Sequence, residues 1–373
     1  MRVWQGARQK KKSILGGVRL VLIGFIGKVI LTIFGISLLI FVHELGHFVV
    51  AKILNMKVYE FVLGYGSKLF SFKIGETVYG ITKIPFGGYV KLEDIKPEEI
   101  SFEEDRLPVL GKQSLWKRVL VIVGGPLMNL ILPIFLLAVI FMAGIPYPTT
   151  IIEEVMLYSP AVEAGLKAGD EIVCIECSEI KDWGEATKII RENPNKTLDF
   201  VVIRDNKKIN LTATIAEKDN HGFLGIGVKL GTKKYGVLSA FYEGLKATVG
   251  IVVILFKLLV SFIQGKQMTG FTGEIIGPVG LAKETFASIQ RGIIDYLGVL
   301  AQMSIGMGIA NLIPVPPLDG GKLVLMGYEL VVRKPLKVKT MLIIQAIGIA
   351  LLLFLMISVT FSDIFGIFAL GGR

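Results

Sequence analysis

Cysteine and histidine are scarce in this sequence, with two cysteines and three histidines among 373 residues. Cys174 and Cys177 form a single CxxC pair, and no second pair exists to complete a four-cysteine zinc site. The flanking residues read as a strand, and no thioredoxin-like βαβ pattern surrounds them. The scarcity therefore argues against redox or zinc chemistry at this pair, which we interpret as small buried or turn residues.

Charge is also sparse, at 19% of residues against 52% hydrophobic, which is the composition of a membrane protein. The apolar residues gather into runs at about 29–51, 119–144, 293–313 and 340–362. Each is near the roughly 20 residues that a bilayer helix needs, so we predict about four transmembrane helices. The net charge of +10 then indicates attraction to the lipid bilayer surface and not nucleic-acid binding.

A further apolar stretch at 238–264 has two interpretations. It carries Glu243, Lys246 and Lys257, with apolar residues at helical spacing between them. We predict an amphipathic helix in the membrane interface, and a fifth span is the alternative.

Two stretches read as β structure. Residues 147–232 carry charge throughout, with Gly-rich turns and alternating runs, which predicts a small soluble α+β domain. Residues 58–92 also alternate around Gly75 and Glu76, which predicts a β-hairpin within the region 29–146 that holds the first two spans. The last two spans fall in 270–373.

The distribution of Lys and Arg predicts the orientation, because short cytoplasmic loops are rich in them. The loops at 52–118 and after the third span are both basic, which places the soluble domain outside the cytoplasm. The basic N-terminal segment, 1–28, conflicts with this arrangement unless it is peripheral or absent from the mature fold.

The chemistry lies in the first span, in the HExxH sequence from His43 to His47. Residues i and i+4 share a helix face, so His43 and His47 can bind one zinc ion, and Glu44 can act as general base on a water at that ion. Zinc lowers the pKa of such a water to about 7 and polarises a carbonyl. Ionisable groups at bilayer depth cost roughly 2.5–3.5 kcal/mol each, which favours a metal site over a chance motif.

A catalytic zinc site needs a third protein ligand. His221 lies in the Gly-rich end of the soluble domain and reads as a surface or turn residue, so a carboxylate must supply the ligand. Asp319 follows a proline-rich break in the third span, whereas Asp295 and Glu329 read as interfacial charges without such a break. Asp319 is therefore the predicted third ligand.

HELGH in the first span and NLIPVPPLDGG after the third resemble the site-2 protease family of intramembrane zinc metalloproteases. The likeness extends to GGYVKLE at 87–93, GGPLMN at 124–129, a PDZ-like stretch at 159–172 and GPVGLA at 277–282. It implies a multi-pass α-helical membrane protein with a membrane-associated β-hairpin and an inserted PDZ-like domain, 147–232.

The resemblance is closest to the bacterial branch, whose members act in the cell membrane in regulated intramembrane proteolysis. It implies that Zn²⁺ is bound by His43, His47 and Asp319, that Glu44 is the catalytic base, and that Asn311 assists near the metal. The implied substrate is a transmembrane protein, an anti-sigma factor trimmed beforehand by another protease.

The PDZ-like domain would be extracytoplasmic and would recognise or filter the trimmed substrate. Residues 147–151 stand where glycine is usual in a carboxylate-binding loop, so size exclusion and binding of a C-terminus both remain open. The hairpin offers a strand edge to an unwound substrate, with Gly87, Gly88 and Tyr89 as substrate-binding residues and a simple turn as the alternative.

Two other classes of function fit the sequence less well. A transporter could use membrane histidines and a carboxylate, but it more usually shows internal repeats and needs no soluble insert. A binding scaffold without catalysis would have no use for Glu44.

Overall fold

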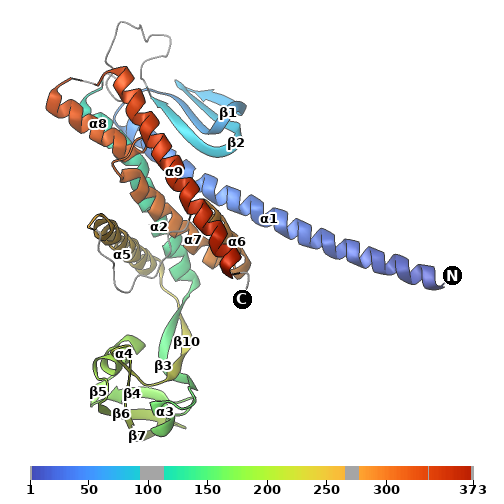
Figure 1. The fold of residues 1–373 in the computed structure, drawn as a ribbon, viewed down its shortest axis with the longest axis vertical. Helices are drawn as coiled ribbons and strands as arrows, with labels where there is room; N and C mark the ends of the chain where they lie inside the picture. The colour runs from blue at the N-terminus through green and yellow to red at the C-terminus, as the bar shows by residue number, and fades with distance from the viewer. Residues whose placement is uncertain (1, 93–112, 265–276, 335, 371–373) are drawn as a thin grey trace. The chain divides into compact units, whose positions relative to one another are not determined.

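The computed structural model describes residues 2–92, 113–264, 277–334 and 336–370 (Figure 1). The chain divides into two compact units, a helical unit of Met1–Ile140 with Val237–Arg373 and a second unit of Phe141–Gly236. Expectations about the side chains of residues 1–23, and about residues 93–112, lie outside the described part.

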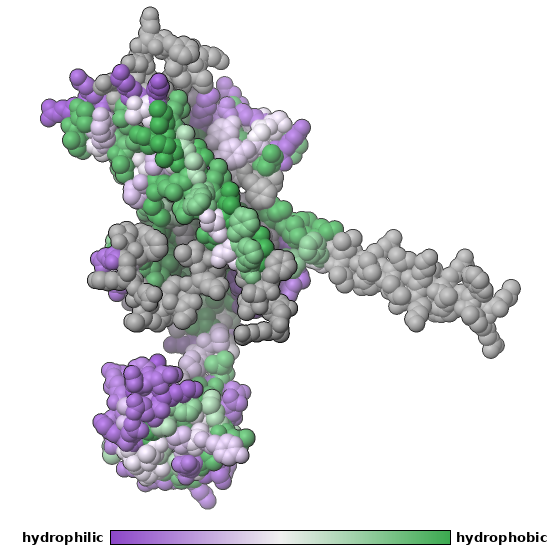
Figure 2. All heavy atoms as spheres, viewed as in Figure 1, coloured by the Kyte–Doolittle hydropathy of each residue, from purple (hydrophilic) through white to green (hydrophobic). Residues whose placement is uncertain are grey.

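The helical unit consists of long apolar helices where the hydrophobic runs predict them. Its helices are α1 (Arg2–Ile53), α2 (Leu115–Ala143), α5 (Val237–Ile263), α6 (Pro278–Arg291), α7 (Ile293–Leu312), α8 (Asp319–Val332) and α9 (Val338–Leu370). Five helical stretches in the described residues are long and apolar enough to cross a membrane, within α1, α2, α5, α7 and α9. Figure 2 shows the apolar surface that α9 exposes along its length.

The α5 helix is the one apolar stretch that we placed in the interface. Its segment Val237–Leu258 meets the length and composition of a span. Large apolar side chains on it, including Leu238, Val249 and Phe256, are exposed. The count of about four spans is thus matched by four helices where predicted, and α5 adds a fifth candidate; its interfacial placement stays a prediction.

Glycines bring α1 and α2 into backbone contact. A Cβ added to Gly46 would collide with the carbonyl oxygen of Gly124, and one added to Gly124 would come 2.8 Å from the carbonyl oxygen of Gly46. Small residues are what membrane helices use to approach this closely. The contact falls within the HExxH turn of α1 and so fixes that turn against α2.

The chain breaks between α7 and α8, as the three prolines predict. Gly320 and Gly321 open α8 so close to this break that added Cβ atoms would collide with the carbonyl oxygens of residues 312 and 313 and crowd Pro316. The break is therefore packed against protein, and it delivers Asp319 as the first residue of α8.

The hairpin consists of β1 (Val58–Ile74) and β2 (Thr77–Leu92), as predicted. Both strands bend, so that residues 60–63 of β1 pair with 88–91 on one side and 78–81 on the other. Residues 70–74 of β1 pair with 77–81 of β2. In the part of the chain that the structure describes, residues 88–92 pair only with residues 58–63, which leaves their outer edge open.

The second unit is an α+β domain, as predicted for 147–232. Its main sheet has the order β10-β3-β4-β6-β7, with β3 (Ile145–Val155), β4 (Glu171–Ile175), β6 (Thr197–Arg204), β7 (Lys207–Thr214) and β10 (Ile226–Lys233). Smaller elements are α3 (Pro160–Glu163), β5 (Ser178–Glu179), α4 (Trp183–Glu192), β8 (Ala216–Lys218) and β9 (His221–Phe223). Its core includes Ile152, Ile172, Phe200 and Ile215, all buried. Cys177 is exposed in a turn at positive φ, and Cys174 is partly buried.

Candidate active site

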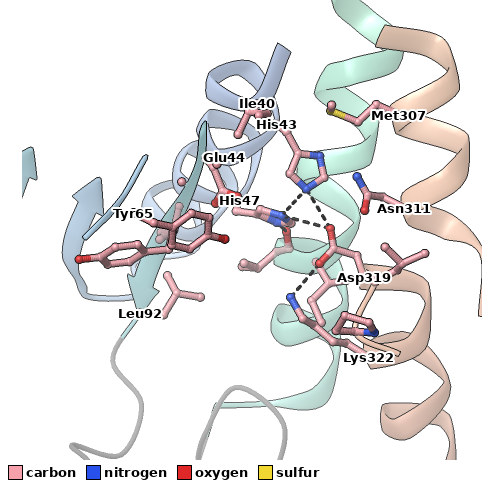
Figure 3. A pocket seen from close by; sticks show the side chains of 18 residues that line it. Ile40, His43, Glu44, His47, Tyr65, Leu92, Met307, Asn311, Asp319 and Lys322 are labelled. Atoms are coloured by element: carbon pink, nitrogen blue, oxygen red, sulfur yellow. Dashed lines mark hydrogen bonds and ion pairs between the residues drawn. The ribbon is translucent and has the colours of Figure 1, made fainter. Parts of the chain in front are cut away.

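Three potential metal ligands converge from two distant parts of the sequence. The Nε2 atoms of His43 and His47 lie 3.2 Å apart, and they lie 3.1 and 3.3 Å from Oδ2 of Asp319 (Figure 3). All three residues belong to one cluster capable of holding a metal ion. We call these three atoms the donor triangle.

The donor triangle has the dimensions that zinc requires. Three corners of a tetrahedron with bonds of about 2.0–2.1 Å are separated by about 3.3–3.4 Å, close to the observed distances. Oδ2 of Asp319 is buried and has no hydrogen-bond partner of its own, which is the signature of an atom that needs a cation. Two imidazoles and a carboxylate with a fourth corner free are the ligands of a catalytic zinc site.

The α2 helix holds His47 in the orientation that ligation needs. Nδ1 of His47 donates to the backbone carbonyl of Val121 at 2.7 Å. Its Nε2 therefore carries the free lone pair, which is the one available to a metal ion. Gly125 makes room for the ring, because a Cβ there would collide with Nε2 of His47. Neither Val121 nor Gly125 was foreseen as a site residue, since a carbonyl and a missing side chain leave little sequence signal.

Lys322 is a site residue that sequence reasoning missed. Its Nζ lies 2.9 Å from Oδ1 of Asp319, so the two carboxylate oxygens have different neighbours. Lys322 stands one turn after Asp319 on α8, and the i, i+3 spacing of the two was a signal available in the sequence. The contact leaves Oδ2 alone to face the two imidazoles.

The donor triangle opens into a cavity of about 490 Å³. The structure brings all the predicted site residues to its walls: His43, Glu44, His47, Gly87, Gly88, Tyr89, Asn311 and Asp319. Gly88 approaches Glu44 so closely that an added Cβ would lie 3.1 Å from its Cγ. Asn311 enters from the last turn of α7 (Figure 3). The open edge of β2 therefore runs beside the candidate base and the candidate ligands.

The side chain of Tyr89, in β2, is held by a residue of the neighbouring strand β1. Its hydroxyl donates to Oε2 of Glu60 at 2.9 Å, and Lys68 pairs with the same oxygen at 2.8 Å. Burial, together with the Glu60 hydrogen bond, raises the pKa of Tyr89 to about 12. The hydrogen bonds from Lys68 and Tyr89 lower the pKa of Glu60. Glu60 is therefore charged and Tyr89 neutral, and their hydrogen bond joins the two strands beside the cavity.

The two rival carboxylates lie away from the donor triangle. Asp295 pairs with Arg291 of α6 at 2.9 Å, and both are exposed, as expected of an interfacial charge. Glu329 is instead mostly covered: its side chain is 13% exposed and pairs at 2.9 Å with Arg118 of α2, whose side chain is 7% exposed. Its placement at the membrane interface stays a prediction. The sequence could not reveal this ion pair between α8 and α2, because its members are far apart along the chain.

Comparison with known families agrees with this geometry. The family model for Peptidase family M50 matches residues 31–355. A protein of Clostridium acetobutylicum named for zinc metalloprotease activity is 32% identical over 339 residues, covering 90% of this chain and 97% of the relative. The regulator of sigma-W protease RasP of Bacillus subtilis is 28% identical over 419 residues, covering 91% of this chain and 99% of the relative. The zinc metalloprotease RasP of Oceanobacillus iheyensis is 29% identical over 412 residues, covering 88% and 96%.

Among solved structures, the PDZ domain of an SdrC-like protein from Listeria monocytogenes matches 22% of this chain and 90% of its own length, at 21% identity and a TM-score of 0.20. The corresponding domain from Listeria innocua matches 21% of this chain and 92% of its own length, at 22% identity and the same TM-score.

Proposed function

We propose, from the premise that the chain belongs to peptidase family M50 and is a zinc metalloprotease of the site-2 type, that it cuts the transmembrane segment of a single-pass protein within the bilayer. Membership of a peptidase family decides against the transporter. The observation that carries the proposal is the donor triangle, which lies beside Glu44 and the open edge of β2 in one cavity.

His43, His47 and Asp319 would hold the zinc ion. When bound, zinc supplies Lewis acidity, which makes water a nucleophile at neutral pH and polarises the scissile carbonyl. Glu44 accepts the proton of the attacking water and then donates it to the leaving amide nitrogen as the C–N bond breaks. The side-chain amide of Asn311 donates a hydrogen bond to the oxygen that becomes negatively charged.

The open edge of β2 supplies what a helical substrate lacks. A transmembrane helix hides its scissile amide in its own hydrogen bonds, so it must be unwound locally before hydrolysis. Among the described residues, 88–92 pair on one side only, and an unwound segment can pair with the other edge by β-addition. Gly87 and Gly88 permit the backbone to approach, and Tyr89 lines the same cavity.

The substrate class we propose is an anti-sigma factor already trimmed outside the cytoplasm. The support comes from the relative in Bacillus subtilis, whose name assigns it to the regulation of sigma-W. The second unit would lie outside the cytoplasm, as the basic loops of the helical unit suggest, and would act as a PDZ-like filter for trimmed substrates.

A comparison of membranes from cells with the parent protein and with its Glu44→Gln variant tests this function. Glutamine keeps the volume of the side chain but cannot accept the proton, so proteolysis should cease while folding and zinc content persist. Fragments with intact transmembrane segments should accumulate in the variant cells only. If both cells contain the same fragments and the purified parent protein does not cleave, the proposal is wrong. If the variant loses zinc, Glu44 is a zinc ligand and not only a base.

A further inference from the structure

The second ring nitrogen of His43 has an unusual neighbour. Nδ1 of His43 lies 3.3 Å from Nδ2 of Asn129, an α2 residue that is completely buried. Oδ1 of the same amide is buried and has no hydrogen-bond partner. A buried amide oxygen without a partner costs about 1–3 kcal/mol, so its presence beside the site needs an explanation.

The proton inventory of His43 supplies one. Its Nε2 faces Asp319 and His47 in the donor triangle, and a ligand nitrogen must offer a lone pair there. The proton of the neutral ring is then on Nδ1, where it requires an acceptor. Nδ2 of Asn129 carries two hydrogens and cannot accept. A half-turn of the amide about its Cβ–Cγ bond exchanges the two ends and satisfies both the histidine proton and the unpartnered oxygen.

We propose that Asn129 is a positioning residue for zinc binding: its side-chain oxygen accepts the Nδ1–H of His43 and so fixes the tautomer and the ring orientation of that ligand. The proposal rests on the assignment of His43 as a zinc ligand. It makes α2 the common outer shell of both histidines, because the Val121 carbonyl of the same helix does the same for His47.

The backbone of Asn129 is itself held in place. Ser304 of α7, fully buried, donates from Oγ to the carbonyl oxygen of Asn129 at 2.8 Å. The residue is therefore fixed on its α7 side through the backbone, which leaves its side chain for α1. A role limited to joining α2 with α7 would not require a polar side chain directed at His43.

The test is a zinc titration of the full-length protein in detergent, by competition with a chelator, with the unfolding midpoint of the zinc-free protein measured in parallel. Asn129→Ala removes the acceptor and should weaken zinc binding about 10- to 100-fold. Asn129→Asp keeps an acceptor, since a carboxylate is the usual partner of a zinc-bound histidine, and should bind within a few-fold of the parent. Thr248→Val removes a buried hydroxyl whose hydrogen bond, among the described residues, goes to the carbonyl of Gly244 in the same α5 helix, and should leave zinc binding unchanged.

The outcomes separate cleanly. Parent-like zinc affinity in Asn129→Ala would overturn the proposal, as would a large loss of affinity in Asn129→Asp, because an amide that acts as a donor cannot be replaced by a carboxylate. Should the alanine variant fail to fold, the aspartate variant decides alone. If the Asp319→Asn variant binds zinc as tightly as the parent does, the ligand set is wrong, and with it the proposed site.

Discussion

Single residues carry the proposed chemistry, and the sequence pointed to several that the structure brings together around one cavity. The sequence pointed to His43, Glu44 and His47 because placing ionisable groups inside an apolar membrane helix is energetically unfavourable. Asp319 was found because a broken helix beside an acid is equally unusual in a membrane. Lys322 and Asn129 were missed because their importance depends on which side-chain atoms they face.

At Asp319, replacement by Asn should abolish proteolysis and weaken zinc binding by at least tenfold, because an amide oxygen is a much weaker zinc ligand than a carboxylate. Asp295→Asn is the matched control, since that carboxylate pairs only with exposed Arg291 in the described part of the chain. Zinc content by metal analysis and cleavage of a transmembrane reporter check both. A fully active Asp319→Asn protein with one zinc would place the third ligand elsewhere.

A buried ion pair in the second unit gives a pH-dependent prediction. Burial by itself would raise the pKa of Asp170, but hydrogen bonds from Arg204 and from the amide of Lys167 outweigh it and lower that pKa. A lowered pKa means that the stabilisation is complete above the unfolded-state value, near 3.9, and disappears as the pH falls through the folded-state value.

Asp170→Asn should accordingly lower the unfolding midpoint of the second unit at pH 7 by several degrees, since each ~1 kcal/mol is worth roughly 4–8 °C in a domain of this size. The difference from the parent should shrink as the pH falls below about 4. Limited proteolysis of the full-length protein across temperature and pH measures it. A difference that stayed constant down to pH 3 would contradict the assignment.

Helices and strands were predicted well where one element could be judged by itself. The apolar runs gave α1, α2, α7 and α9, and the alternation around Gly75 gave the hairpin. The bend that places residues 60–63 between two parts of β2 was not predictable, because it depends on pairing across the chain. The α5 helix illustrates the same limit, since length and composition suit a span and an interfacial helix alike.

The ion pair between Arg118 and Glu329 joins α8 to α2, and so ties the helix of Asp319 to the helix that orients His47. Glu329→Gln should destabilise the helical unit by about 1–3 kcal/mol, between the values for exposed and fully buried pairs, because it removes a charged contact between α8 and α2. Its zinc affinity should fall as well. Thermal unfolding in detergent measures the first effect and chelator competition the second, and parent-like values for both would show that the ion pair supports neither the helical unit nor the site.

The two units of the molecule were predicted from composition, because the second interrupts the apolar pattern with charge and turns. Its proposed place outside the cytoplasm rests on the basic loops alone and is open to test. The free thiols report on this directly. Cys177 is exposed, and the two cysteines of the chain both lie in this unit.

A membrane-impermeant maleimide should therefore label Cys177 in cells whose outer layers have been removed and whose cell membrane is intact. The Cys177→Ser variant should lose most of that label, because Cys174 is less accessible. Cys174 and Cys177 are the two thiols of the chain, so the single and double Cys→Ser variants account for all of its label. Labelling that appears only after the cell membrane is permeabilised would reverse the orientation.

The donor triangle also has a consequence for biogenesis. Its two histidines leave the ribosome early, whereas its carboxylate is on α8, near the end of the chain. At about 5–20 residues per second, tens of seconds of synthesis separate them. With Asp319 as the third zinc ligand, the nascent chain would carry an incomplete site during that interval and could not attack neighbouring membrane proteins at the insertion machinery. Activity would begin only when α8 has packed against α1 and α2, so that complete assembly would itself protect against misdirected proteolysis.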